Sequence, residues 1–158
     1  MIPSAHESQQ VWSKEPPATL TSNESGQFEC RWVRLEPNPE SACIFTKHLE
    51  APIDCPVAHG EGRIHVRDAS TLSAMKAAGQ IAFRYASRDG LNDFSYPTNP
   101  NGSVDHIAGL CNPQGNVMGM MPHPENHIYS WQRPGGSAED WCLGLPLFRS
   151  AIRYAQTL

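Results

Sequence analysis

The first clear pattern along the chain is an alternation of apolar and polar residues in Phe28-Glu-Cys-Arg-Trp32, which continues to Leu35. A period of two predicts a half-buried β-strand over this segment. Short apolar segments bounded by turn-forming residues predict further strands. These segments are residues 53–58, 64–66, 81–85, 106–111 and 117–121.

Two other segments have the features of helices. Residues 72–78 follow Asp68 and Ser70, whose side chains are good helix N-caps. Residues 147–155 begin after Pro146 and can place several apolar side chains on one face. A series of strands with one helix between them and one helix last predicts an α/β layered domain.

Polar segments separate these elements. Residues 1–22 are rich in Ser, Pro and Gln and have little periodicity, so we expect a loosely structured start. Residues 87–103 are rich in Gly, Asn, Pro and Asp, which predicts a long surface loop. Residues 112–116 contain a Gly and predict the turn of a hairpin.

The bulk composition narrows the class of protein. A length of 158 residues suggests one domain or a large piece of one. The net charge of -4 comes without a basic stripe, which argues against a nucleic-acid partner. No apolar run approaches the ~20 residues that span a bilayer, and the N-terminus does not resemble a signal peptide. Five cysteines without a C-x-x-C pair indicate a reduced, cytoplasmic protein rather than a disulfide framework.

The strongest candidate for chemistry is Pro122-His-Pro-Glu125, which directly follows a predicted strand. Prolines on both sides of His123 restrict the backbone and disfavour a helix there. Residues two apart in an extended chain point the same way, so Glu125 can accept a hydrogen bond from one ring nitrogen of His123. The other nitrogen is then available as a general base. A surface pair or a buried structural His has the same spacing.

Two further groups of residues offer alternatives. In Pro56-Val-Ala-His-Gly-Glu-Gly62, the glycines allow close approach of a ligand or simply form a tight loop. His123, Glu125 and His127 lie at alternate positions and are possible zinc ligands. A zinc deaminase would also need C-x-x-C, which this sequence lacks.

Several motifs in one order resemble the class I glutamine amidotransferases, and among them the glutaminase subunit of phosphoribosylformylglycinamidine synthase. The resemblance covers most of the chain, from about residue 18 to the last predicted helix. It rests on residues 23–32, 56–62, 99–103, 107–109 and 115–125. It implies the C-terminal portion of a flavodoxin-like, three-layer α/β domain that lacks the opening strands and the nucleophile elbow.

The family's chemistry implies roles for particular residues. A Cys thiolate attacks the side-chain amide of glutamine, and a glutamyl thioester and ammonia form. His123 is then the general base and acid, and Glu125 orients it. Ser25 and Phe28 are expected near the glutamine. His59 and Glu61 are expected to face a partner or the route of the ammonia.

The resemblance also implies partners and cofactors. The expected partners are a synthetase subunit, which uses ATP and Mg, and a small accessory subunit. The glutaminase chain itself is expected to need no metal or cofactor.

The sequence also departs from the family's pattern. The nucleophile normally lies in a Gly-Cys-Asn-Gly-like turn upstream of Asn23, and none of the five cysteines has that context. Asn126 stands where Arg commonly follows the catalytic Glu. We therefore expect a truncated product with little glutaminase activity alone. The alternatives are a non-catalytic docking module for the synthetase subunit and a metal-dependent hydrolase using His123, Glu125 and His127.

Overall fold

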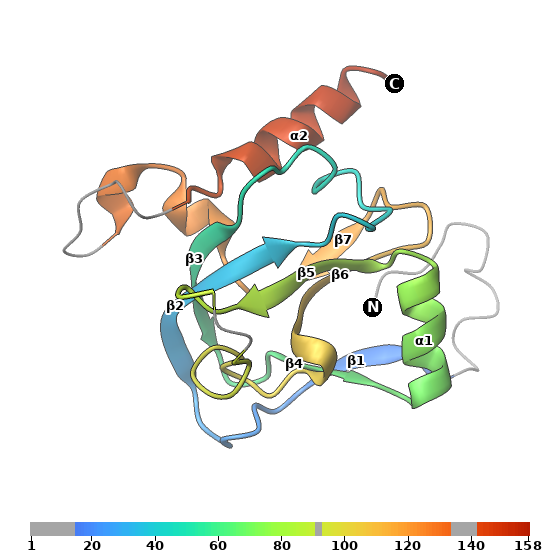
Figure 1. The fold of residues 1–158 in the computed structure, drawn as a ribbon, viewed down its shortest axis with the longest axis vertical. Helices are drawn as coiled ribbons and strands as arrows, with labels where there is room; N and C mark the ends of the chain where they lie inside the picture. The colour runs from blue at the N-terminus through green and yellow to red at the C-terminus, as the bar shows by residue number, and fades with distance from the viewer. Residues whose placement is uncertain (1–14, 91–92, 134–141) are drawn as a thin grey trace.

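The computed structural model describes residues 15–90, 93–133 and 142–158, and its main feature is a five-stranded antiparallel sheet (Figure 1). The strand order is β3-β2-β5-β6-β7. The strands are β2 (Glu29–Pro37), β3 (Ile53–His59), β5 (Ile81–Ala86), β6 (Ile107–Cys111) and β7 (Met118–Met120). All five predicted strand positions in this sheet are confirmed, with ends that differ by one or two residues.

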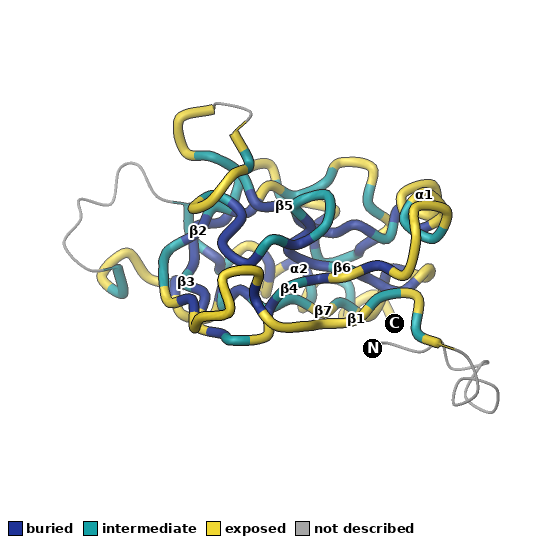
Figure 2. Tube along the Cα trace, turned by 90° about the horizontal axis from the view of Figure 1, so that it is seen from below, coloured by how far each residue is buried: buried dark blue, intermediate teal, exposed yellow. Residues whose placement is uncertain are grey.

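The alternating side chains of β2 and β3 build the main core. Val33 and Leu35 of β2 face Cys55 and Ile53 of β3 across the ladder, and all four are buried. Phe83 of β5 joins the same apolar cluster. Figure 2 shows that most of the deeply buried residues lie on β2, β3, β5 and β6. Burial of one face explains the period of two in this part of the sequence.

A smaller two-stranded sheet is formed by β1 (Ala18–Thr21) and β4 (Arg63–Val66), which pair antiparallel. The expectation of a loose start is wrong at residues 18–21, while residues 1–14 lie outside the described residues. The strand was missed because it is short and largely exposed. It is held by cross-strand pairing with residues that lie more than 40 positions later, such as Leu20 with Ile64.

Two α-helices complete the described part of the fold. Helix α1 (Ala69–Ala77) begins after Asp68, whose side chain accepts a hydrogen bond from the Thr71 backbone N–H, as an N-cap does. Helix α2 (Leu145–Ala155) begins at the residue before Pro146. In Figure 1, α2 lies at the opposite end of the molecule from β1 and β4.

The other short elements in the described ranges are 3-10 turns. They are η2 (Val104–His106), η3 (Pro124–His127) and η4 (Ser130–Gln132). The described residues between 87 and 103, which exclude positions 91 and 92, form no helix or strand, as expected of a loop. No helix among the described residues is long and apolar enough to cross a lipid bilayer.

Candidate active site

The side chains of His123 and Glu125 meet as predicted, but Glu125 lies in a 3-10 turn and not in the extended chain that was expected. His123 Nδ1 lies 2.8 Å from Glu125 Oε1. Because an ionised carboxylate only accepts hydrogen bonds, Nδ1 carries the proton and donates it to Glu125. The other ring nitrogen, Nε2, is then the free base. This contact is confirmed, and its catalytic use remains a prediction.

The backbone brings this pair from one edge of the sheet to the other. The chain leaves β7 at Met120, and the His123 N–H then donates to the Pro56 carbonyl of β3 at 2.9 Å. The 3-10 turn η3 follows at once, with His123 as its N-cap. Prolines 122 and 124 lack the N–H groups that a regular strand or helix interior needs, so the chain turns here.

The His123–Glu125 pair is open to solvent. The side chains are 39% and 54% exposed. An ion pair or hydrogen bond between such exposed groups contributes only up to ~1 kcal/mol. The pair therefore depends on the backbone of η3 to hold the two side chains in register.

His127 is placed quite differently from the other two residues of the candidate zinc site. It is 1% exposed, and its Nδ1 lies 2.6 Å from the carbonyl oxygen of Asp54. Its ring also meets Trp32 edge-on, with centroids 5.0 Å apart. The alternative in which His127 binds zinc beside His123 and Glu125 is not supported, because its ring is buried against Trp32 whereas the other two side chains are exposed. Among the described residues, no group of three or more His, Cys, Asp or Glu side chains could hold a metal ion.

Asp54 is the main charged residue of this region that the sequence analysis missed. It is fully buried, and Arg34 donates two hydrogen bonds to it, both at 3.0 Å. Arg88 lies 3.1 Å from the same carboxylate, and the Cys142 N–H donates to it at 2.9 Å. Its position within the apolar run of β3 is the signal that could have revealed it, since an unpaired charge there would be costly.

His59 lies in the interior, and the expectation that it faces a partner or an ammonia route stays a prediction. It is 3% exposed, and its Nδ1 lies 3.0 Å from Asn23 Oδ1. The Asn23 amide group donates to the carbonyls of Gln27 and His59, which fixes Oδ1 as the acceptor. His59 Nε2 faces Asn101 Nδ2 at 3.4 Å and accepts. Burial lowers the pKa of His59 and keeps the ring neutral.

The His59 network joins three turns that are distant in sequence. Asn101 also donates to the Gly62 carbonyl at 2.8 Å and contacts the hydroxyl of Tyr85 at 3.1 Å. A side chain at Gly62 would collide with the His59 ring, with a Cβ only 2.4 Å away. This explains one of the two glycines of the His-Gly-Glu-Gly segment as a packing requirement. Glu61, in contrast, is exposed.

The two residues expected near glutamine lie on the turn before β2. Ser25 Oγ is 3.1 Å from Glu29 Oε1, and Glu29 is buried beside Arg31, with Oε2 2.9 Å from Nε. Phe28 is 66% exposed. These contacts anchor Ser25 and leave the Phe28 ring available to a ligand or a partner.

Among the described residues, no cysteine has a thiol that is both exposed to solvent and close to the His123 side chain. Burial raises the pKa of Cys55 well above its usual range, although this thiol lies close to the His123 backbone. Cys43 and Cys111 are buried and interact with each other, which lowers the pKa of Cys43 to about 7. Cys30 is exposed on β2.

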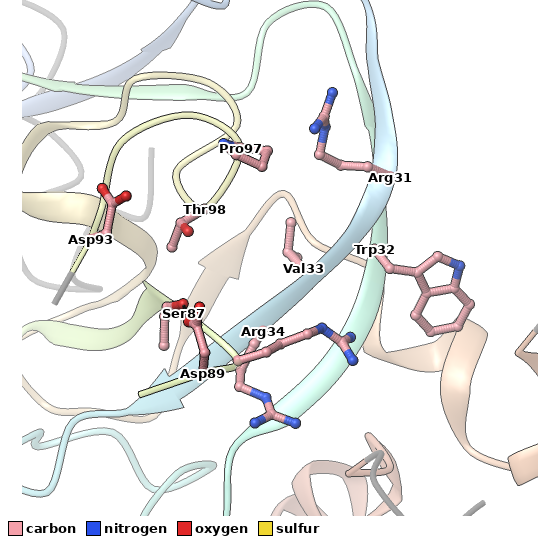
Figure 3. Close-up of a pocket in the computed structure, with 11 residues that line it drawn as sticks. Arg31, Trp32, Val33, Arg34, Ser87, Asp89, Asp93, Pro97 and Thr98 are labelled. Carbon is pink, nitrogen blue, oxygen red and sulfur yellow. Dashed lines mark hydrogen bonds between the residues drawn. The ribbon is translucent and has the colours of Figure 1, made fainter. Parts of the chain in front are cut away.

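A cavity of about 490 Å³ lies between β2 and the loop after β5 (Figure 3). Arg31, Arg34 and Thr98 line it, and neither His123 nor Glu125 does. Figure 3 shows that Trp32 points to the opposite side of β2 from Val33, as alternation along a strand requires. The cavity is therefore separate from the His123–Glu125 pair.

Comparison with known sequences gives a consistent result. Residues 1–155 match the family model of the CobB/CobQ-like glutamine amidotransferase domain. The chain is 42% identical over 146 residues to the phosphoribosylformylglycinamidine synthase subunit PurQ of Treponema denticola, covering 89% of this chain and 54% of that protein. It is 37% identical over 153 residues to PurQ of Archaeoglobus fulgidus, covering 92% and 54%.

A solved structure agrees in fold. The structure of PurLQS from Thermotoga maritima matches with a TM-score of 0.62 and 32% identity, over 87% of this chain and 53% of the matched chain. The predicted amidotransferase fold class is thereby confirmed. The chain spans about half the length of the relatives that it matches.

Proposed function

This chain belongs to the family of CobB/CobQ-like glutamine amidotransferase domains, and we propose that it supplies the His–Glu part of a glutaminase that serves phosphoribosylformylglycinamidine synthase in purine biosynthesis. The observation that carries this proposal is the 2.8 Å contact between His123 Nδ1 and Glu125 Oε1. It leaves Nε2 of an exposed imidazole free to accept a proton, which is what activation of a thiol requires.

The proposed reaction assigns a separate role to each group. The Nε2 atom of His123 takes the proton of a thiol, and the thiolate attacks the side-chain amide carbon of glutamine. His123 then gives this proton to the departing nitrogen, which leaves as ammonia, and a glutamyl thioester remains. Water, activated by the same nitrogen, releases glutamate and restores the thiol. Glu125 holds the ring in the required tautomer and stabilises its protonated form.

The thiol itself is proposed to come from outside this sequence. Cys30 of β2 is exposed. It lies opposite Ala58 on the β2–β3 ladder and has no described contact with His123. Cys55 is buried, and its raised pKa disfavours the thiolate. This part of the proposal agrees with the relatives' greater length, since the chain covers 54% of the Treponema denticola protein.

The partners and cofactors follow from the same assignment. The matched Thermotoga maritima structure is that of PurLQS, and it supports our proposal that a synthetase subunit and a small accessory subunit are partners of this chain. We propose that ATP and Mg are used by the synthetase subunit, and that this chain needs neither. A cytoplasmic location is supported by the five cysteines, all of which are free thiols.

The test is a reconstitution. The chain is mixed with the other half of the Treponema denticola protein and with a synthetase subunit, and assembly is verified by size-exclusion chromatography. Glutamate and ammonia release are then measured. We expect activity in the assembly, a loss on the order of 10⁶-fold for His123→Ala and on the order of 10⁴-fold for Glu125→Gln, as for other triads.

The neighbouring variant Asn126→Ala is the control, because Asn126 is exposed in the same turn, and it should retain activity. Ammonia release by the chain alone at the rate of the assembly would refute the need for an external thiol. Activity of an assembly that survives His123→Ala would refute the proposal as a whole.

A further inference from the structure

The turn that carries Glu125 is attached to β3 at both of its ends. At its start, the His123 N–H donates to the carbonyl of Pro56 at 2.9 Å. At its end, His127 Nδ1 lies 2.6 Å from the carbonyl of Asp54. Asp54 and Pro56 are two residues apart, so their carbonyls point to the same side of the strand. Glu125 lies midway between the two attachments.

The second attachment is itself rigid. Asp54 is fully buried and bonded to Arg34, and its backbone N–H donates to the Cys142 carbonyl at 2.8 Å. The His127 ring is buried against Trp32, which Figure 3 shows on the opposite side of β2 from Val33. The His127 carbonyl accepts a hydrogen bond from the Gly144 N–H at 2.8 Å. His127 is thus fixed by its ring, its Nδ1 and its backbone.

The close approach of Gly144 to Pro124 also restricts this turn. A side chain at Gly144 would place a Cβ 2.4 Å from the Pro124 carbonyl oxygen. The start of α2 therefore lies directly against η3. Contacts from β3 on one side and from α2 on the other leave this short turn little freedom to move.

We propose that His127 is a positioning residue, which locks η3 onto β3 so that Glu125 meets His123 and selects its Nδ1–H tautomer. This inference rests on the proposed function for its catalytic meaning. The geometric part is independent of that function. The exposed His123–Glu125 contact is weak by itself, so its persistence requires an anchored backbone. The nearest anchor beyond Glu125 is the buried His127 ring, two residues away.

The test reads the tautomer of His123 in the full 158-residue chain by long-range ¹H–¹⁵N NMR, with the signal assigned from its loss in His123→Gln. In the wild type we expect the Nδ1–H form to dominate at neutral pH. His127→Phe keeps an aromatic ring beside Trp32 but removes the donor to Asp54. We expect it to lower the Nδ1–H to Nε2–H ratio by about two- to fivefold, the range of an exposed pair. Asn126→Ala, in the same turn, should leave the ratio unchanged.

The outcomes separate the two proposals. A wild-type ratio that favours Nε2–H overturns the His123–Glu125 assignment and hence the proposed function. A dominant Nδ1–H form that persists in His127→Phe overturns the role of His127 alone. If His127→Phe does not fold, Trp32→Leu, which removes the ring that holds His127, must lower the ratio in the same direction. An unchanged ratio in folded Trp32→Leu would then contradict the proposal.

Discussion

Arg34 and Asp54 lie directly opposite one another on β2 and β3, and the guanidinium and the carboxylate form two parallel hydrogen bonds of 3.0 Å each. The carboxylate is fully buried, and Arg88 approaches it to 3.1 Å. One acidic group thus faces two basic ones on the side of the sheet that His127 and Cys142 cover.

Replacement of Asp54 by Asn should therefore destabilise the protein strongly. Two partly buried guanidinium groups would lose their shared counter-charge, which costs about 3–5 kcal/mol for comparable buried pairs. Urea unfolding followed by circular dichroism measures the free energy of unfolding. Glu36→Gln, an exposed residue of β2, is the matched control and should change stability by less than about 0.5 kcal/mol. Equal effects of the two variants would show that burial of the pair is unimportant.

Gly115 permits a close approach between the β6–β7 turn and the loop after β2. It has φ +72°, and a Cβ there would lie 1.9 Å from the Ala42 carbonyl oxygen. The Gly115 carbonyl also accepts a hydrogen bond from Ile44 N–H at 2.9 Å. Gly115→Ala should cost about 3 kcal/mol, because strain and overpacking add.

Gly90→Ala separates the two contributions to that cost. Gly90 has a similar φ of +70°, and a Cβ there would meet nothing within 4 Å. Only the backbone strain remains, so we expect a loss of about 1 kcal/mol. Both values come from thermal or urea unfolding, and a Gly115→Ala variant no less stable than Gly90→Ala would contradict the close approach.

Much of the fold could be predicted because local pattern and burial agree. In β2, the alternating positions Val33 and Leu35 are the ones that enter the core. The strand β1 could not be predicted, since only pairing with β4 makes residues 18–21 extended. Helix α1 was predicted three residues too short at its start, because Ala69, Ser70 and Thr71 precede its first large apolar residue, Leu72.

The candidate site also has parts that the sequence could predict and parts that it could not. The contact between His123 and Glu125 was predictable from their two-residue separation, but the 3-10 turn that carries Glu125 was not, because the flanking prolines were taken to favour an extended chain. The placement of His127 and His59 was not, because each side chain meets partners more than 30 positions away, Asp54 and Asn23. A sequence pattern does not reveal whether a His faces solvent or such a buried partner.

The neutral His59 ring should make stability depend on pH. Its pKa is lowered in the folded state by burial and by His123, and Glu29 opposes this shift. In the unfolded chain the pKa returns to about 6.5. The unfolded state therefore binds more protons below that pH, and stability is lost as the pH falls from about 6.5 toward the folded pKa, by up to about 1.4 kcal/mol per pH unit.

The comparison with His59→Gln isolates this effect. The variant loses hydrogen bonds and should be less stable at pH 8, but its stability should fall less steeply between pH 7 and pH 5. The pKa of His106 is also lowered by burial, and that contribution remains in both proteins. Urea unfolding across this range gives both slopes, and parallel slopes would mean that His59 is not held neutral.

Thiol reactivity should follow burial rather than the number of cysteines. Cys30 is exposed, whereas Cys43, Cys55 and Cys111 are buried. Burial also raises the pKa of Cys55, so its reactive thiolate is scarce at neutral pH. With a disulfide reagent such as DTNB at pH 7.5, Cys30 should react first, and the buried thiols should react only after denaturation. Cys30→Ser should remove the fast phase. A fast phase that persists in this variant would mean that another thiol is open to solvent and available to a neighbouring imidazole. Cys142 would be the first such thiol to test.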